Sequence, residues 1–136
     1  MARLIEDFDY EQTGFRRYRL LKNLIIDTGI LPPDGKEIRT KFGHLAANGV
    51  LTLFAGYRWD GATGAIDTPS IMRASAVHDW FCTHVVTRKL PTSYRRKGDD
   101  LFYLICIEDE MPRVRAEYAH TAVVGYGKLV VHMLEG

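Results

Sequence analysis

A histidine and an aspartate, His78 and Asp79, stand next to each other inside a mostly apolar stretch, residues 72–81. Burying an imidazole or a carboxylate costs free energy unless each group finds a partner. Neighbouring residues of a helix project about 100° apart, so the two side chains cannot serve one partner in the same way. We therefore expect them to have two different roles, whether structural or chemical.

Asp99 is the residue that could complete a site with His78. If the helices that carry them pack antiparallel, as a short connection favours, the carboxylate can meet the imidazole. A carboxylate that accepts a hydrogen bond from one imidazole nitrogen fixes the tautomer and leaves the other nitrogen free as a general base. Hydrolases activate water with this arrangement. The same pair is also a common way to tie two helices together, and the sequence leaves both interpretations open.

Asp79 and Asp60 are the candidate metal ligands. Asp79 faces away from the imidazole and could bind a hard cation such as Ca²⁺, together with backbone oxygens of residues 59–64. Asp60 lies in that segment, where its alternative role is to cap a turn. His84 and His120 lack carboxylates at ligand spacing, so we expect no zinc site. The chain also has no Gly-x-Ser-x-Gly turn, phosphate-binding loop or Gly-x-Gly-x-x-Gly junction.

The N-terminal half of the chain carries strand patterns. Residues 1–15 have mixed charge and a stop at Gly14, and we expect an arm that becomes ordered only against another surface. Alternating apolar and polar residues predict three strands, over residues 15–27, 37–42 and 49–57. Asn48-Gly49 is a strong signal for a tight turn between the last two. Together they predict a small antiparallel sheet over residues 16–58.

The C-terminal half carries helix patterns. A glycine-containing loop, residues 59–67, precedes it. Asp67-Thr68 predicts a helix cap that is followed by Pro69 at the first helical position. Apolar spacing predicts three helices, over residues 69–86, from about 94 onward, and from about 112 to 133. The expected fold class is therefore α+β, with a small N-terminal antiparallel sheet followed by a three-helix C-terminal half.

Length and composition limit the classes of function. A chain of 136 residues with 46% apolar residues is sized for a single domain, residues 1–136. Its 18 basic and 17 acidic residues nearly balance, so we expect no nucleic-acid partner and no general attraction to anionic membranes. Cys82 and Cys106 are most simply free thiols. We expect no signal peptide and no membrane-spanning segment, and therefore a protein made in a reducing cytoplasm.

Several short motifs are spread over residues 20–128. They are Asp60-Gly61-Ala62-Thr63-Gly64, Asp67-Thr68, Met72-Arg73 with Ser75, His78-Asp79, Asp99 with Phe102, Glu108-Asp109-Glu110-Met111 and Arg115-Ala116. Together they resemble a family encoded by phages and prophages and known only as a domain of unknown function. The resemblance implies a tailed-phage protein, found in the virion or the host cytoplasm, whose partners are other virion proteins. It implies no particular reaction.

A second resemblance concerns chemistry. The order and spacing of His78-Asp79, Asp99 with its following aromatic residue, Ala116, Tyr118 and Gly127 are similar to bacterial phospholipases A2. That resemblance implies a phospholipase A2-like helix pair in which His78 activates water, Asp99 orients His78, and Asp79 binds Ca²⁺. The disulfides of that family have no counterpart at the matched positions. Its usual calcium loop is replaced here by residues 60–64.

Two functions follow as expectations. The first is a virion component, in the tail, neck or baseplate, that carries a hydrolase-like site at His78 and Asp99. The alternative is a free phage-encoded hydrolase, phospholipase A2-like or directed at another ester or amide of the host envelope, that acts during entry or lysis. In either case we expect a lipid or other envelope component as substrate and Ca²⁺ as the candidate cofactor. We do not expect the chain to be an integral membrane protein.

Overall fold

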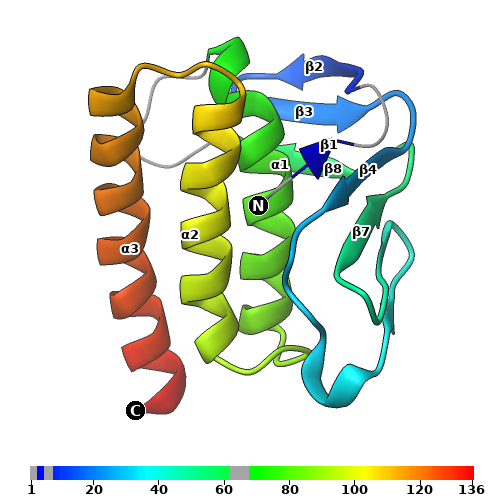
Figure 1. The fold of residues 1–136 in the computed structure, drawn as a ribbon, viewed down its shortest axis with the longest axis vertical. Helices are drawn as coiled ribbons and strands as arrows, with labels where there is room; N and C mark the ends of the chain where they lie inside the picture. Colours follow the sequence, from blue (N-terminus) through cyan, green and yellow to red (C-terminus); the bar gives the residue numbers. More distant parts are fainter. Residues whose placement is uncertain (1–2, 5–7, 62–67) are drawn as a thin grey trace. The chain divides into compact units, whose positions relative to one another are not determined.

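The computed structural model describes residues 3–4, 8–61 and 68–136. These residues belong to two compact units, within residues 1–61 and 62–136. The first unit is built of β-strands and the second of helices (Figure 1). An antiparallel sheet followed by three helices confirms the predicted α+β class. The prediction of a single domain stays a prediction.

In its described residues, the first unit has two antiparallel sheets. The five-stranded sheet has the order β1 (Arg3–Leu4), β4 (Leu24–Asp27), β7 (Val50–Leu53), β6 (Gly43–Leu45) and β5 (Ile38–Arg39). The three-stranded sheet has the order β2 (Tyr10–Gly14), β3 (Arg17–Leu20) and β8 (Arg58–Asp60). A 3₁₀ turn, η1, covers Pro33–Gly35. Successive side chains of a strand point to opposite faces, which buries Leu51 and Leu53 of β7 together.

The arm predicted over residues 1–15 is wrong, because both of its described strands pair with other strands of the unit. β1 pairs with β4, and β2 pairs with β3. On β2, the ring of Tyr10 lies 6.0 Å from that of Tyr18 and 5.9 Å from that of Trp59. This aromatic cluster stabilises a segment whose mixed charge, taken alone, suggests mobility.

The strand boundaries differ from the prediction in several places, including β7, which ends at Leu53 where the predicted strand continues to residue 57. The strand predicted over residues 15–27 is two strands, β3 and β4, which belong to different sheets. The strand predicted over residues 37–42 shortens to β5, and the partner of β7 across the Asn48-Gly49 turn is β6. Trp59-Asp60, expected in a loop, belong to β8, where Trp59 is opposite Tyr18. The division of residues 15–27 and the place of Trp59-Asp60 in a strand come from pairing between segments that are distant in the sequence, β4 with β7 and β3 with β8.

The described residues of the second unit form three helices. They are α1 (Pro69–Val86), α2 (Ser93–Glu108) and α3 (Arg113–Glu135). Figure 1 shows the three helices side by side, with α2 in the middle, where it packs on both α1 and α3. Both ends of α1 and α3 and the start of α2 lie within two residues of the predicted positions. Thr68 and Pro69 occupy the N-cap and the first helical position, as predicted, whereas Asp67 lies outside the described residues.

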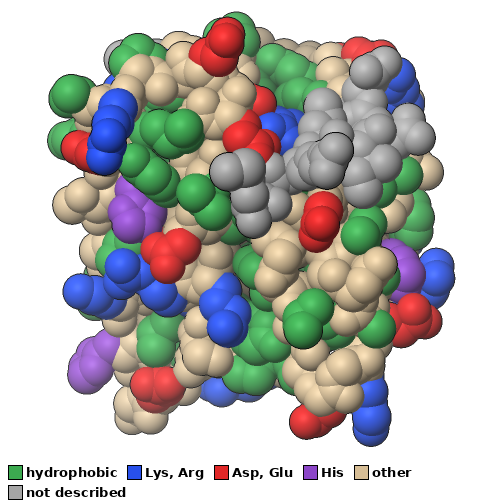
Figure 2. All heavy atoms as spheres, in the orientation of Figure 1, with side chains coloured by type: hydrophobic (Ala, Val, Ile, Leu, Met, Phe, Trp, Pro, Cys, Tyr) green, Lys and Arg blue, Asp and Glu red, His purple; other side chains and the backbone are tan. Residues whose placement is uncertain are grey.

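Charged side chains of both signs are interspersed on the face drawn in Figure 2. Some form exposed ion pairs four residues apart on one helix, such as Arg96 with Asp100 and Arg113 with Glu117. Hydrophobic side chains also reach the surface over the N-terminal part of α3, at the upper left of Figure 2. Within the described part of the chain, none of the helices has the length and apolar character needed to cross a membrane.

Candidate active site

The close approach of α1 and α2 depends on Gly98. A Cβ atom added at Gly98 would lie 3.0 Å from the Cβ of Phe81, so a larger residue there would push the two helices apart. The short connection over residues 87–92 makes the helices antiparallel neighbours. This packing brings His78 of α1 opposite Asp99 of α2.

His78 and Asp99 form a short hydrogen bond, with His78 Nε2 at 2.6 Å from Asp99 Oδ1. A carboxylate can only accept, so Nε2 carries the proton and Nδ1 keeps its lone pair. The Asp99 side chain is 1% exposed and that of His78 is 12% exposed, so the carboxylate is sealed and the imidazole is largely buried. The structure therefore brings the predicted pair together, in the tautomer that a general base needs.

Arg95 is the third member of this cluster. Its Nε donates to the same carboxylate oxygen, Asp99 Oδ1, at 2.9 Å, and its Nη2 donates to the backbone oxygen of Val123 on α3 at 3.1 Å. The side chain is buried, so its charge and that of Asp99 compensate each other away from water. Arg95 thus fixes the carboxylate and joins α2 to α3. We call His78, Asp99 and Arg95 the buried trio.

Cys82 lies one helical turn beyond His78 on α1. Its Sγ is 3.5 Å from Nε2 and 3.7 Å from Nδ1 of the imidazole. Burial raises the pKa of the Cys82 thiol to about 12, so the side chain stays protonated at neutral pH. Cys82 is therefore a poor nucleophile here, because the reactive form of cysteine is the thiolate. The ring of Phe102, 5.2 Å from that of His78, supplies an apolar neighbour.

Burial lowers the pKa of His78 below its ordinary value, because a charged imidazolium loses solvation inside the protein. The hydrogen bond and the negative charge of Asp99 oppose this shift, and the positive charge of Arg95 adds to it. The net direction is downward, so His78 is neutral at pH 7. A neutral imidazole is the form that can take a proton from water.

The depressed pKa of His78 predicts a pH dependence of stability. Burial also lowers the pKa of His84, whose Nδ1 donates to the backbone oxygen of Trp80 at 2.6 Å. Below an unfolded-state pKa of about 6.5, the unfolded chain binds more protons than the folded chain. We expect the free energy of unfolding to be constant at pH values well above this pKa and to fall as the pH is lowered through it, between pH 7 and pH 5. Urea unfolding at a series of pH values measures it. A His78→Gln/His84→Gln variant should flatten the profile, and an equally steep profile would contradict the assignment.

The surface of α2 carries a second cluster of the same composition, which we call the exposed trio. His120 Nε2 and Arg96 Nε both lie 2.9 Å from Asp100 Oδ1. Arg96 and Asp100 are more than half exposed, unlike their counterparts in the buried trio. Despite partial burial, the hydrogen bonds from His120 and Arg96 lower the pKa of Asp100. The exposed trio offers matched control positions for the buried one.

The two predicted calcium ligands belong to different units of the chain. Asp79 is half-buried on α1, and Asp60 ends β8 in the other unit, opposite Arg17 in the ladder. Residues 62–64, which would supply backbone oxygens, lie outside the described residues. Within residues 3–4, 8–61 and 68–136, no group of three or more His, Cys, Asp or Glu side chains is placed to hold a metal ion. Calcium binding at Asp79 and Asp60 stays a prediction.

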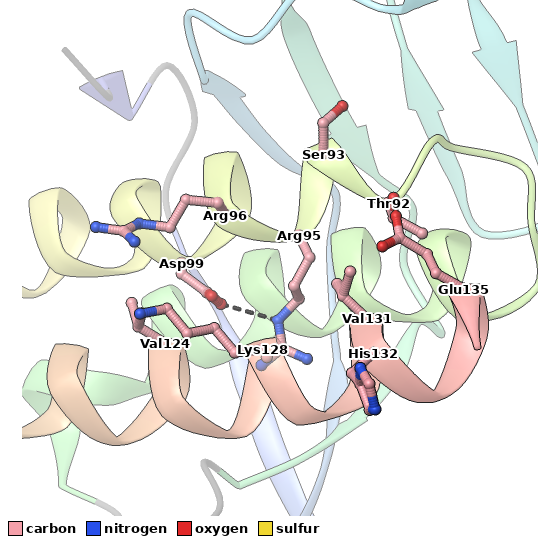
Figure 3. Close-up of a pocket in the computed structure, with 11 residues that line it drawn as sticks. Thr92, Ser93, Arg95, Arg96, Asp99, Val124, Lys128, Val131, His132 and Glu135 are labelled. Atoms are coloured by element: carbon pink, nitrogen blue, oxygen red, sulfur yellow. Dashed lines mark hydrogen bonds and ion pairs between the residues drawn. The ribbon is translucent and has the colours of Figure 1, made fainter.

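A groove of about 470 Å³ lies between the start of α2 and the C-terminal half of α3 (Figure 3). Arg95 and Asp99 lie in its wall, and the side chains of Arg96 and Lys128 lie beside them. His78 is not among the described residues that line it. The groove therefore borders the buried trio on the α3 side, but His78 does not face it.

Sequence reasoning identified His78 and Asp99 but missed Arg95 as their partner. The signal was present, because Arg95 and Asp99 are four residues apart on one helix, a spacing at which opposite charges pair. Comparison with models of protein families, with curated proteins and with solved structures found no match. Function is therefore inferred from the geometry of the site and from the two resemblances in the sequence.

Proposed function

We propose that this chain is a hydrolase of a tailed phage, in which His78 is the general base and Asp99 orients it. The observation that carries the proposal is the 2.6 Å bond from His78 Nε2 to a sealed carboxylate, which leaves Nδ1 unprotonated. Arg95 supports the role by holding Asp99 from its other side. A neutral imidazole with a fixed tautomer is also the form that a general base needs, which supports this role for His78.

The reaction we propose is the hydrolysis of an ester. His78 Nδ1 takes a proton from a water molecule while the water oxygen forms a bond to the carbonyl carbon. The buried carboxylate of Asp99 stabilises the imidazolium that results. When the bond from the carbonyl carbon to the leaving oxygen breaks, His78 returns the proton to that oxygen. The products are a carboxylic acid and an alcohol, and the imidazole is regenerated.

The finer parts of the proposal rest on the two resemblances. Similarity to bacterial phospholipases A2 favours an envelope lipid as substrate and Asp79, with Asp60, as ligands of Ca²⁺. If bound there, Ca²⁺ would act as a Lewis acid toward the carbonyl oxygen. Similarity to the phage-encoded family favours a place in the virion, in the tail, neck or baseplate, among other virion proteins. Mass spectrometry of purified phage particles tests that location separately from activity.

The test of the activity compares the parent protein with a His78→Gln variant. The glutamine amide can still donate to Asp99, so the helix tie is preserved while the base is lost. The substrates are a fluorogenic acyl ester and phosphatidylglycerol vesicles, each with millimolar Ca²⁺ or with a chelator. We expect the variant to lose about 10²- to 10⁴-fold in rate. Activity that survives chelation would remove Ca²⁺ from the proposal and leave His78 in place.

The exposed trio supplies the control, because His120→Gln changes the same chemical pair at the surface. We expect His120→Gln to keep the parent rate, and circular dichroism should show that both variants are folded. A folded His78→Gln protein that hydrolyses ester at the parent rate would exclude His78 as the base. A parent protein without activity on either substrate class, with or without Ca²⁺, would exclude the hydrolase we describe.

A further inference from the structure

The surface of α3 that faces away from α2 carries a row of large apolar side chains. The row consists of Val114, Tyr118, Leu129 and Met133, which are 55–81% exposed. The opposite face of α3 is already used, because it buries Ala116, Ala119, Val123 and Gly127. α3 therefore has one apolar face inside its unit and a second one at the surface. Contiguous apolar surface of this kind marks a site of interaction.

The spacing of the row is symmetric about the middle of the helix. Val114 and Met133 are equally distant from that point, and Tyr118 and Leu129 are equally distant from it as well. If a second α3 lies antiparallel across the first, Val114 of each copy therefore meets Met133 of the other copy. Tyr118 meets Leu129 in the same way. A parallel partner would not use this symmetry. The row thus fits an antiparallel copy of itself.

Charged residues along one flank of the row favour the same arrangement. Arg113, Glu117, Lys128 and Glu135 follow this flank in sequence order. In an antiparallel pair, Glu117 approaches the partner's lysine. Arg113 approaches the partner's Glu135, which within its own chain accepts a hydrogen bond from Thr92 of α2 at 2.6 Å. A parallel pair would instead place the charged flanks of the two helices on opposite sides of the interface, where they do not meet. Arg113 and Glu117 pair within one chain at 3.1 Å, an exposed contact that can exchange for one between chains.

We propose that this face of α3 binds the same face of a second copy of the chain, as an antiparallel homodimer. The two-fold axis passes beside Ala122 and Gly125, whose small side chains allow the helices to approach closely at the crossing. Four side chains from each copy make a small interface, at the lower end of the size range of specific interfaces, so the dimer forms in a concentration-dependent way.

The test is the molar mass of the full chain over a range of concentrations, by sedimentation equilibrium. We expect the parent to shift from monomer to dimer, and a Tyr118→Glu/Leu129→Glu variant to remain monomeric. Leu104→Glu is the control, because it places the same charge at an exposed leucine of α2, outside the row. A parent that stays monomeric at millimolar concentration would overturn the proposal. So would a monomer that binds phosphatidylglycerol vesicles through this face, since the occupant would then be a lipid surface.

A charge exchange tests the antiparallel register without placing charge in the apolar row. Glu117→Lys and Lys128→Glu should each weaken the dimer about tenfold or more, because each puts like charges opposite each other across the axis. The Glu117→Lys/Lys128→Glu double variant should restore the parent affinity. If the single variants leave dimerisation unchanged, or if the double variant is the weakest of the three, the antiparallel arrangement is wrong.

Discussion

Replacing Arg95 by methionine is expected to lower the free energy of unfolding by about 3–5 kcal/mol, the usual cost of removing one partner from a buried ion pair. Methionine keeps an unbranched apolar stem but cannot donate to Asp99 or to the backbone of Val123. The carboxylate would then be buried with His78 as its one remaining partner in the trio. Urea unfolding followed by circular dichroism measures the loss.

The matched control is Arg96→Met, one residue along the same helix. Arg96 also pairs with an aspartate four residues later at 2.9 Å, but both side chains are exposed. Its loss should cost about 0.3–0.5 kcal/mol, because water and salt screen exposed pairs. Equal costs for the two variants would show that the ion pair of Arg95 does not behave as a buried one.

The Arg95→Met variant should also change the titration of His78. The positive charge of Arg95 helps to hold the pKa of His78 below its ordinary value, although burial is the larger cause. Removing that charge while Asp99 remains should raise the pKa of the imidazole. NMR titration of the His78 ring measures the shift, which a purely structural role for Arg95 would not require. The rise would also move the loss of activity at low pH to a higher pH.

The helices were predictable from the sequence because their signals are local. The start of α1 at Pro69, for example, follows from a cap residue and a proline that are adjacent in the chain. Strand pairing is not local, which explains the failures in the first unit. Nothing near Tyr10 shows that it will pack against Trp59, so residues 1–15 resembled an arm. For the same reason, the sequence predicted a single strand over residues 15–27, where the structure has two strands in different sheets.

The candidate site was predictable as a pair and not as a trio. His78 and Asp99 stand out because each interrupts an apolar helix face. Arg95 does not stand out, because two identical arginine–aspartate spacings overlap on α2, one starting at Arg95 and the other at Arg96. Only the packing of α1 and α3 on opposite sides of α2 decides which pair is buried. The side chain of Asp99 is accordingly 1% exposed, whereas that of Asp100 is 54% exposed.

Gly127→Ala is expected to destabilise the protein, although alanine is normally the better residue in the middle of a helix. A Cβ atom added at Gly127 would lie 2.8 Å from Asp99 Oδ2 and 2.9 Å from Arg95 Nε. Neither group can move aside easily, because each is buried and held by the other. Overpacking of this kind costs about 1–3 kcal/mol. The close approach of α3 to the buried trio therefore depends on the missing side chain at position 127.

Gly125→Ala provides a control of opposite sign on the same helix. Gly125 is exposed, and a Cβ atom added there would meet nothing within 4 Å. The substitution should stabilise the protein by about 0.5–1 kcal/mol, because alanine loses less backbone entropy in a helix than glycine does. Urea unfolding of both variants, at a protein concentration low enough to avoid association through α3, measures the two changes. If Gly127→Ala is also stabilising, the trio has room to relax, and Asp99 is not held rigidly enough to fix the tautomer of His78. If Gly127→Ala is destabilising and also shifts the pKa of His78, α3 positions the site through Asp99 and Arg95.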